Sequence, residues 1–134
     1  MKKISILLIV LLASTIRLSA QYNSVGHDEV NNRWNVDINE LHYVWYESDP
    51  SEITSFYLSI ENNTAYTIVA MDVEVTLKNN GKTFFKKLCR INISQPCNPS
   101  EVQDTSQWYF VSPITRTNFG KKYSWSAIVK QVYV

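Results

Sequence analysis

Few residues in this chain have the types and spacing that catalysis requires. The two histidines are His27, in a His27-Asp28-Glu29 run that could bind a metal ion, and His42, which could act as a general base. We interpret the run as part of a polar leader, and His42 as a rim residue on the strand side opposite Tyr43 and Trp45. The sequence has no serine-hydrolase, zinc-peptidase or phosphate-binding motif. We therefore predict a protein that is not an enzyme and binds no metal and no cofactor.

Acidic residues beside aromatic ones are the remaining candidates for catalysis. Glu47, Asp49 and Glu52 follow closely on Tyr43, Trp45 and Tyr46. Paired carboxylates hydrolyse glycosidic bonds, and acids next to aromatic rings are typical of carbohydrate sites. The Asp49-Pro50-Ser51 sequence is also a turn signal, so we interpret the acids as a solvated turn next to core aromatics.

The chain is rich in large aromatic residues, with four Trp and eight Tyr. Most of them fall in strand-like stretches and are expected in the core. Trp108, Tyr109 and Phe110 are consecutive, and successive side chains of a strand point to opposite faces. At least one aromatic of this run is therefore expected outside the core, and Trp108 and Tyr109 are our candidate binding residues.

Two short patterns could mark N-glycosylation, namely Asn62-Asn63-Thr64 and Asn92-Ile93-Ser94. The first lies between two strand-like alternations, where Asn and Thr commonly make turns. We favour turn chemistry over modification, because the start of the chain has a bacterial character.

The first 20 residues have the features of a secretory signal peptide. Met1-Lys2-Lys3 is basic, Ile4–Ala13 is apolar apart from Ser5, and Ser19-Ala20 precedes the expected cut before Gln21. No cysteine lies near the cut, so a lipid anchor is not expected. We predict a signal peptide (1–20), a flexible leader (21–32) and one domain (33–134). The protein is then periplasmic or extracellular, and contacts the membrane only through its signal peptide before cleavage.

The only two cysteines, Cys89 and Cys97, are separated by seven residues. An exported protein meets an oxidising compartment, so an even cysteine count favours a disulfide between them. Their spacing is that of neither a redox pair nor a zinc site.

Charge is distributed unevenly along the chain. Gln21–Leu77 has ten acidic residues and one basic residue, whereas Lys78–Val134 has nine basic and two acidic ones. After cleavage the net charge is slightly negative, so nucleic acid is not an expected partner. We expect acidic and basic strands to lie side by side and pair internally. A bipolar docking surface is the alternative.

The mature chain shows the period of β-strands and no convincing helical period. The apolar residues change phase between Val36-x-Ile38 and Leu41-x-Tyr43, which predicts a bulge near Asn39-Glu40. Val69–Leu77 alternates cleanly and is followed by Asn80-Gly81, a tight hairpin signal. We predict an all-β protein, an antiparallel immunoglobulin-like β-sandwich of about seven strands. A closed up-and-down barrel is the alternative.

One resemblance supports this architecture. The residues that carry it are Phe56-x-Leu58-x-Ile60-x-Asn62, Ile68, the Val69–Leu77 strand, a glycine turn, Pro99-Ser100-Glu101 and Phe110. Over Ser55–Val134 this order resembles bacterial exported immunoglobulin-like domains of the FxLYD type, with Ser100 where that family has glycine and Leu77-Lys78 where it has Tyr-Asp. The resemblance implies a non-catalytic accessory or interaction domain.

These observations favour an exported, non-enzymatic domain that contacts a protein or a cell-surface glycan in the bacterial envelope. One alternative is a small periplasmic inhibitor of a secreted hydrolase, whose loop Gln95–Glu101 inserts into its target. Another is a carbohydrate-binding module that uses exposed Trp or Tyr.

Overall fold

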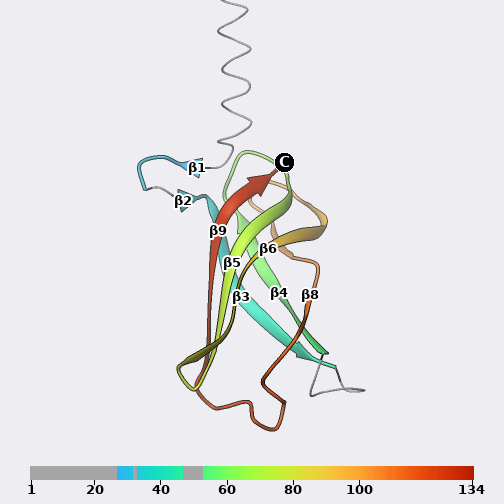
Figure 1. The fold of residues 1–134 in the computed structure, drawn as a ribbon. Helices are drawn as coiled ribbons and strands as arrows, with labels where there is room; N and C mark the ends of the chain where they lie inside the picture. The colour runs from blue at the N-terminus through green and yellow to red at the C-terminus, as the bar shows by residue number, and fades with distance from the viewer. Residues whose placement is uncertain (1–26, 32, 47–52) are drawn as a thin grey trace, which may run out of the picture.

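The computed structural model describes residues 27–31, 33–46 and 53–134, and these residues form strands and turns (Figure 1). The strands are β1 (His27–Asp28), β2 (Arg33–Trp34), β3 (Val36–Trp45), β4 (Ile53–Asn62), β5 (Ile68–Asn79), β6 (Lys82–Cys97), β7 (Val102–Asp104), β8 (Trp108–Val111) and β9 (Tyr123–Tyr133). The all-β prediction is confirmed. The part of the chain that the structure describes holds no helix capable of crossing a membrane.

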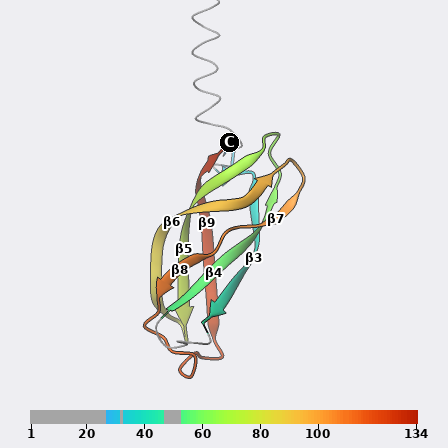
Figure 2. The ribbon, with the colours of Figure 1, turned by 90° about the vertical axis from the view of Figure 1, so that its right-hand side faces the viewer.

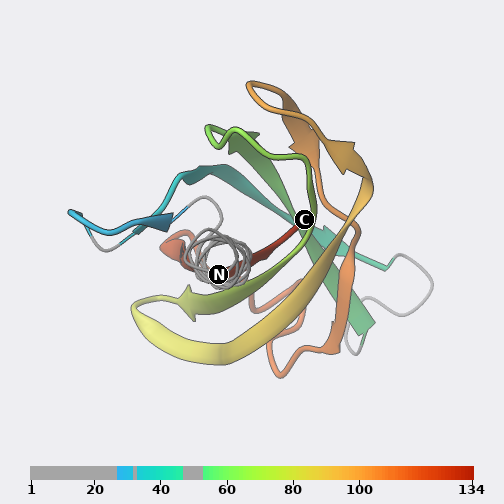
Figure 3. The same cartoon turned by 90° about the horizontal axis from the view of Figure 1, so that it is seen from above.

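Two antiparallel sheets make up most of the molecule (Figures 2 and 3). In the first, which we call the β4 sheet, β4 pairs with β3 along one edge and with β7 and β8 along the other. In the second, the β5 sheet, β5 lies between β6 and β9. A small hairpin, β1–β2, precedes them. The two sheets meet at one place, where Ile93 of β6 forms a bridge with Thr105, but they do not close into a barrel, so the closed up-and-down alternative is wrong.

The alternation in β4 and β5 explains how the two sheets share a core. Phe56, Leu58 and Ile60 of β4 are fully buried, and so are the alternate apolar residues of β5 from Met71 to Leu77. These side chains belong to one continuous cluster. Burying each such side chain stabilises the fold by about 1.5–3 kcal/mol, so the faces that meet here hold the sheets together.

The change of phase in β3 is a bulge, as predicted. Ile38 pairs with Ile60, whereas Glu40 pairs with Ser59, so Asn39 is an extra residue without a partner in the register. One extra residue reverses the facing of all that follow. The apolar residues on both sides of Asn39 therefore point towards the same core.

The hairpin between β5 and β6 is also as predicted. Asn80 and Gly81 have φ angles of 53° and 79°, and the flanking residues Asn79 and Lys82 are paired. Positive φ at both central positions defines the two-residue turn that matches strand twist, and Asn-Gly tolerates it at least cost.

The predicted disulfide is wrong, because Cys89 and Cys97 are both free thiols in the core. Cys89 pairs with Val73 and Cys97 with Ile68, five positions further along β5. That separation corresponds to roughly 16 Å along a strand, whereas a disulfide needs Cα atoms within about 7 Å. The prediction of a disulfide rests on the expected export and the even number of cysteines, and neither contains information on the register of β6 with β5.

Reduction should therefore leave the stability of the protein unchanged. We expect the same melting temperature with and without dithiothreitol, and iodoacetamide should label both thiols only after unfolding. Burial raises the pKa of Cys89 to about 11, so its reactive thiolate is scarce in the folded protein. Two results would contradict this arrangement: a melting temperature that falls on reduction, or an intact mass lower by two hydrogen atoms than that of the chain with two free thiols.

Charges separate between the sheets more than we expected. The strands of the β4 sheet carry four acidic residues and no Lys or Arg, namely Asp37, Glu40, Glu61 and Asp104. The strands of the β5 sheet carry the two acids Asp72 and Glu74 and the bases Lys78, Lys82, Lys86, Lys87, Arg90 and Lys130. Among the described residues, Asp72–Arg90 is the one ion pair joining the acidic and basic halves of the chain. Strands from the acidic and the basic half of the chain do lie side by side, but most of their charged side chains form no ion pair among the described residues.

Candidate functional site

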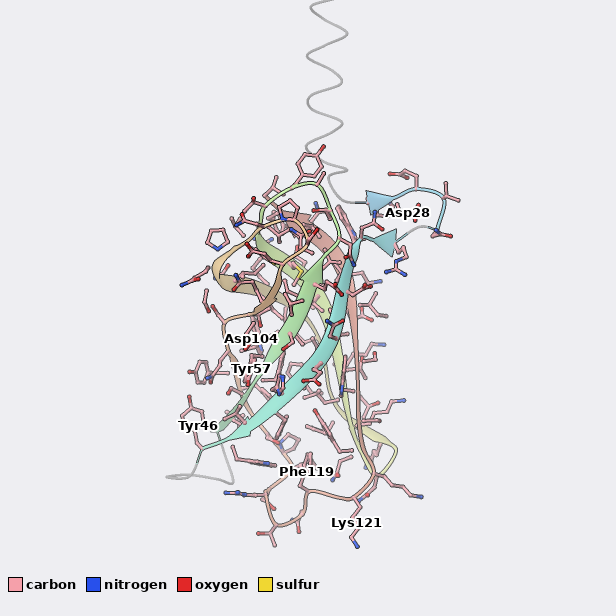
Figure 4. All side chains as sticks on the ribbon, turned by 180° about the vertical axis from the view of Figure 1, so that it is seen from behind. Asp28, Tyr46, Tyr57, Asp104, Phe119 and Lys121 are labelled. Carbon is pink, nitrogen blue, oxygen red and sulfur yellow. The ribbon has the colours of Figure 1, made fainter. Side chains whose placement is uncertain are left out.

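The outer face of the β4 sheet collects the polar and aromatic residues that alternate with its core residues. His42 of β3 lies opposite Tyr57 of β4, and Ser59 of β4 lies opposite Asp104 of β7. Asp104, Tyr57 and Tyr46 follow one another along this side of the molecule (Figure 4). Strand register thus brings together residues from three separate segments.

His42, Ser59 and Asp104 are the residue types of a catalytic triad, but their geometry differs from one. Ser59 Oγ donates to Asp104 Oδ1 at 2.7 Å. His42 Nε2 lies 3.4 Å from Ser59 Oγ and 3.0 Å from Glu40 Oε2, so one ring nitrogen faces both groups. In a triad the imidazole stands between serine and carboxylate and contacts them through different nitrogens. Here the serine hydroxyl donates its hydrogen bond to the carboxylate and not to the imidazole, so the histidine is not placed to activate it.

The ring of His42 has a second role on this face. It stacks on Tyr57 with ring centroids 4.6 Å apart and an interplanar angle of 18°. Its side chain is 37% exposed, as expected for a rim residue. The contact fixes the position of the Tyr57 ring on the sheet surface.

The two candidate binding residues point to opposite faces of β8. Trp108 packs against the core, with Lys87 Nζ 5.5 Å from its ring centroid. Tyr109 is 57% exposed on the outer face, and its ring lies 5.7 Å from that of Tyr46. A side-chain hydrogen bond with Tyr109 raises the pKa of Tyr46. Of the pair, Tyr109 is the one available to a ligand.

An open groove of about 600 Å³ lies at the edge of this face, where Ser94 of β6 also lines it. Its lining residues are Tyr57, Ser94, Asp104, Thr105, Ser106, Gln107 and Tyr109. Sequence reasoning missed Tyr57 and Gln107. The alternation around Phe56 places Tyr57 on the outer face, but only the register of β4 with β7 and β8 shows that it lines this groove.

The other candidates for chemistry serve local structure. Asp28 accepts hydrogen bonds from the side chain and backbone of Asn31 and from the backbone of Val30, which lower its pKa and close the β1–β2 turn. No group of three His, Cys, Asp or Glu residues converges as metal ligands within the described ranges. Glu47, Asp49 and Glu52 lie outside the described residues.

Tyr43 and Trp45 belong to an aromatic cluster with residues of the segment before β9. Both rings contact Phe119, at centroid distances of 5.4 and 5.6 Å. Tyr123 packs 4.7 Å from Phe119 and 5.7 Å from Tyr43. Its hydroxyl is buried and has no hydrogen-bond partner among the described residues, and burial raises the pKa of this phenol.

Replacing Tyr123 with Phe should therefore stabilise the protein. The substitution removes a buried hydroxyl without a partner, which costs about 1 kcal/mol or more, and keeps the ring contacts. Chemical denaturation should show a gain of about 1 kcal/mol in the free energy of unfolding. Tyr43→Phe is the matched control, because Tyr43 donates to Ser112 Oγ at 3.2 Å and should lose stability instead. Equal losses in both variants would show that Tyr123 has a partner.

The two glycosylation patterns differ in accessibility. Asn62 is fully buried and its amide is bonded to Thr64, Tyr66 and Cys97, so folding excludes a glycan there. Asn92 is exposed on β6. The interpretation of Asn62-Asn63-Thr64 as turn chemistry fits this geometry.

The segment proposed as an inhibitory loop, Gln95–Glu101, is held against the domain. It ends in a tight turn, in which Glu101 N donates to Asn98 O at 3.1 Å and Ser100 N to Asn62 O at 2.7 Å. Cys97 is buried and no disulfide closes the segment. The feature that favoured an inhibitor, a rigid disulfide-closed loop, is therefore missing.

Ser100 has a φ of 68°, at the position where the FxLYD-type pattern has glycine. A left-handed conformation costs a residue with a Cβ atom about 1–2 kcal/mol, and glycine avoids this cost. Glycine also gives the unfolded chain more conformational freedom, which offsets part of the gain. We therefore expect Ser100→Gly to raise the free energy of unfolding by about 0.5 kcal/mol. Ser124→Gly, on an exposed position of β9, should lower it. The urea midpoints of both variants measure the difference, and a loss of stability in Ser100→Gly would contradict it.

Comparison of the chain with protein-family models, with curated proteins and with solved structures finds no match in any of the three. The assignment of a function therefore depends on the geometry of this chain.

Proposed function

We propose that the chain is an exported, non-enzymatic immunoglobulin-like domain that binds a protein or glycan of the bacterial envelope through the outer face of its β4 sheet. The observation that carries the proposal is the groove beside Tyr109, where exposed aromatic rings and hydrogen-bonding groups meet. Aromatic side chains surrounded by polar groups are typical of binding surfaces. The hydrogen bond from Ser59 to Asp104, which leaves the serine without activation by His42, supports the non-enzymatic part of the proposal.

The strand order supports the immunoglobulin-like part of the proposal. The order β3-β4-β7/β8 corresponds to strands A, B and E, and the order β6-β5-β9 to strands C′, C and F. The chain crosses between the sheets after β4, β6 and β8, as expected of a Greek-key sandwich. The position of strand E is shared by β7 and β8, which pair with different parts of β4.

Binding to isolated envelope fragments tests the proposed function. Sedimentation of the purified protein with the fragments should show binding, and Tyr109→Glu should weaken it by about tenfold or more. Leu88→Glu is the matched control, because Leu88 is similarly exposed, at 56%, on the β5 sheet. Loss of binding in Leu88→Glu but not in Tyr109→Glu would place the binding surface on the β5 sheet and contradict the proposal. If the unaltered protein does not sediment with the fragments, the proposed function is refuted.

The export part of the proposal has its own test. Residues 1–20 lie outside the described residues, and their composition supports a signal peptide. The intact mass of the protein recovered from outside the cytoplasm should correspond to a chain that begins at Gln21. A full-length mass in the cytoplasmic fraction would refute export.

A further inference from the structure

The groove on the β4 sheet has two aromatic walls that neighbouring rings hold in place. Tyr57 is stacked on His42, and Tyr109 is paired with Tyr46 through ring contact and a side-chain hydrogen bond. Side chains that are ordered before binding lose little conformational freedom when a ligand arrives. The groove is therefore prepared for a ligand with a flat apolar surface.

The groove also presents hydrogen-bonding groups close to these rings. Gln107 Oε1 accepts a hydrogen bond from Ser55 Oγ at 2.9 Å, which orients the amide. Asp104 accepts one from Ser59 at 2.7 Å, which orients the carboxylate. Ser94 and Ser106 add hydroxyls 3.4 Å apart. A purely apolar ligand would leave these groups unpaired at a cost, so the ligand must itself be polar.

The charge of the surrounding face restricts the ligand further. None of the described residues that line the groove is basic, and the strands of the β4 sheet carry four carboxylates and no Lys or Arg. Nucleic acids and acidic polysaccharides would meet like charge with no Lys or Arg on these strands to compensate it. Neutral and cationic ligands are accepted, and an ammonium group could pair with Asp104.

We propose that this groove binds a non-anionic oligosaccharide, with a preference for amino sugars over neutral sugars and for both over uronic acids. The inference rests on the proposed function and specifies its ligand. A pyranose ring has an apolar C–H face that packs on a tyrosine ring, and hydroxyls at its edge that bond to carboxylate, amide and serine groups. Tyr57 and Tyr109 supply rings for the C–H face, and the hydroxyls can bond to Asp104, Gln107 and Ser106.

Calorimetric titration of the purified protein tests the ligand class and its order of affinity. The probes are tetramers of glucosamine, N-acetylglucosamine and galacturonic acid, at a mildly acidic pH at which the amine is protonated. We expect glucosamine tetramer to bind about tenfold more tightly than the acetylated tetramer, because one charge-assisted hydrogen bond is added. The uronate should bind more weakly than either.

Variants assign this binding to the groove. Tyr57→Ala and Tyr109→Ala should each weaken binding of the charged glucosamine tetramer and of the neutral N-acetylglucosamine tetramer about tenfold or more, because stacking on one aromatic ring is lost. Asp104→Asn keeps the shape of the side chain and should remove the preference for glucosamine while binding of the acetylated tetramer persists. Tyr66→Ala is the control, because Tyr66 is an exposed tyrosine, 42% accessible, away from the groove lining.

The outcomes separate the ligand class from the general function. Envelope binding that depends on Tyr109 but no binding of any tetramer would overturn the sugar proposal and leave the proposed function standing. Uronate binding as tight as glucosamine binding, or a preference that survives in Asp104→Asn, would also overturn it. If neither envelope fragments nor sugars bind, both proposals fail.

Discussion

Replacing Asn62 with Ala should cost the protein about 3 kcal/mol of unfolding free energy, from a total expected to be about 5–15 kcal/mol. Asn62 is fully buried where the chain leaves β4. Its Nδ2 donates to Tyr66 O at 2.7 Å and Cys97 O at 2.9 Å, and its Oδ1 accepts from Thr64 N at 2.9 Å and Thr64 Oγ1 at 2.7 Å. One side chain thus ties the turn after β4 to the end of β6.

The size of this effect follows from what the substitution leaves behind. Alanine removes the Asn62 hydrogen bonds to the Cys97 carbonyl and the Thr64 amide, whereas the Tyr66 carbonyl keeps the Thr64 hydroxyl as a donor. Each buried polar group left without a partner costs about 1–3 kcal/mol. Relaxation and entering water reduce the sum. Urea denaturation followed by tryptophan fluorescence measures the loss, and Asn63→Ala, at the exposed neighbouring position, is the control.

Asn62→Asp gives a second readout with a definite sign. The aspartate would place an oxygen where Nδ2 faces two carbonyl oxygens, which disfavours the ionised form and raises the pKa of the folded-state carboxyl. The variant should therefore be least stable at neutral pH and recover stability as pH falls through that raised pKa. Stability of either variant within about 0.5 kcal/mol of the unaltered protein would contradict this account of the turn.

Replacing Phe56 with Ala should have the largest effect on the core, with a loss of about 3–5 kcal/mol. Phe56 is fully buried on the central strand of its sheet, and its ring lies 5.9 Å from Phe85 and 6.0 Å from Phe110. Phe85 belongs to β6 of the other sheet, so the cavity would open between the sheets. Thermal and urea unfolding measure the loss.

The adjacent residue supplies the matched control. Tyr57 points to the outer face, so Tyr57→Ala should lower stability much less than Phe56→Ala while it weakens ligand binding. The pair separates folding from function at neighbouring positions. Similar losses of stability in both variants would show that the inner and outer faces of β4 are not distinguished as described.

Local signals in the sequence predicted the parts of the fold that depend on neighbouring residues. The change of apolar phase predicted the bulge at Asn39, because one extra residue reverses the direction in which every later side chain of the strand points. Asn80-Gly81 gave the hairpin, because few dipeptides accept positive φ twice. Both features are decided within a few residues.

Features that depend on register between distant strands could not be predicted. The prediction of a disulfide failed because the pairing of β6 with β5 sets the positions of Cys89 and Cys97. The division of the Val102–Val111 segment follows Thr105, whose hydroxyl accepts a hydrogen bond from Leu58 N at 2.9 Å. Tyr109 was a candidate from its own neighbours, but its companion Tyr57 lies over 50 positions earlier in the chain.

The separation of acidic strands on one side from mainly basic strands on the other gives the molecule a permanent electric dipole across its thickness. Packed sheets lie about 10 Å apart, which is close to the Debye length of about 8 Å at physiological salt. A molecule that comes within this distance of a negatively charged surface therefore experiences a torque. That torque turns the β5 sheet towards an anionic surface, and a ligand without negative charge is the kind that approaches the groove of the β4 sheet unopposed.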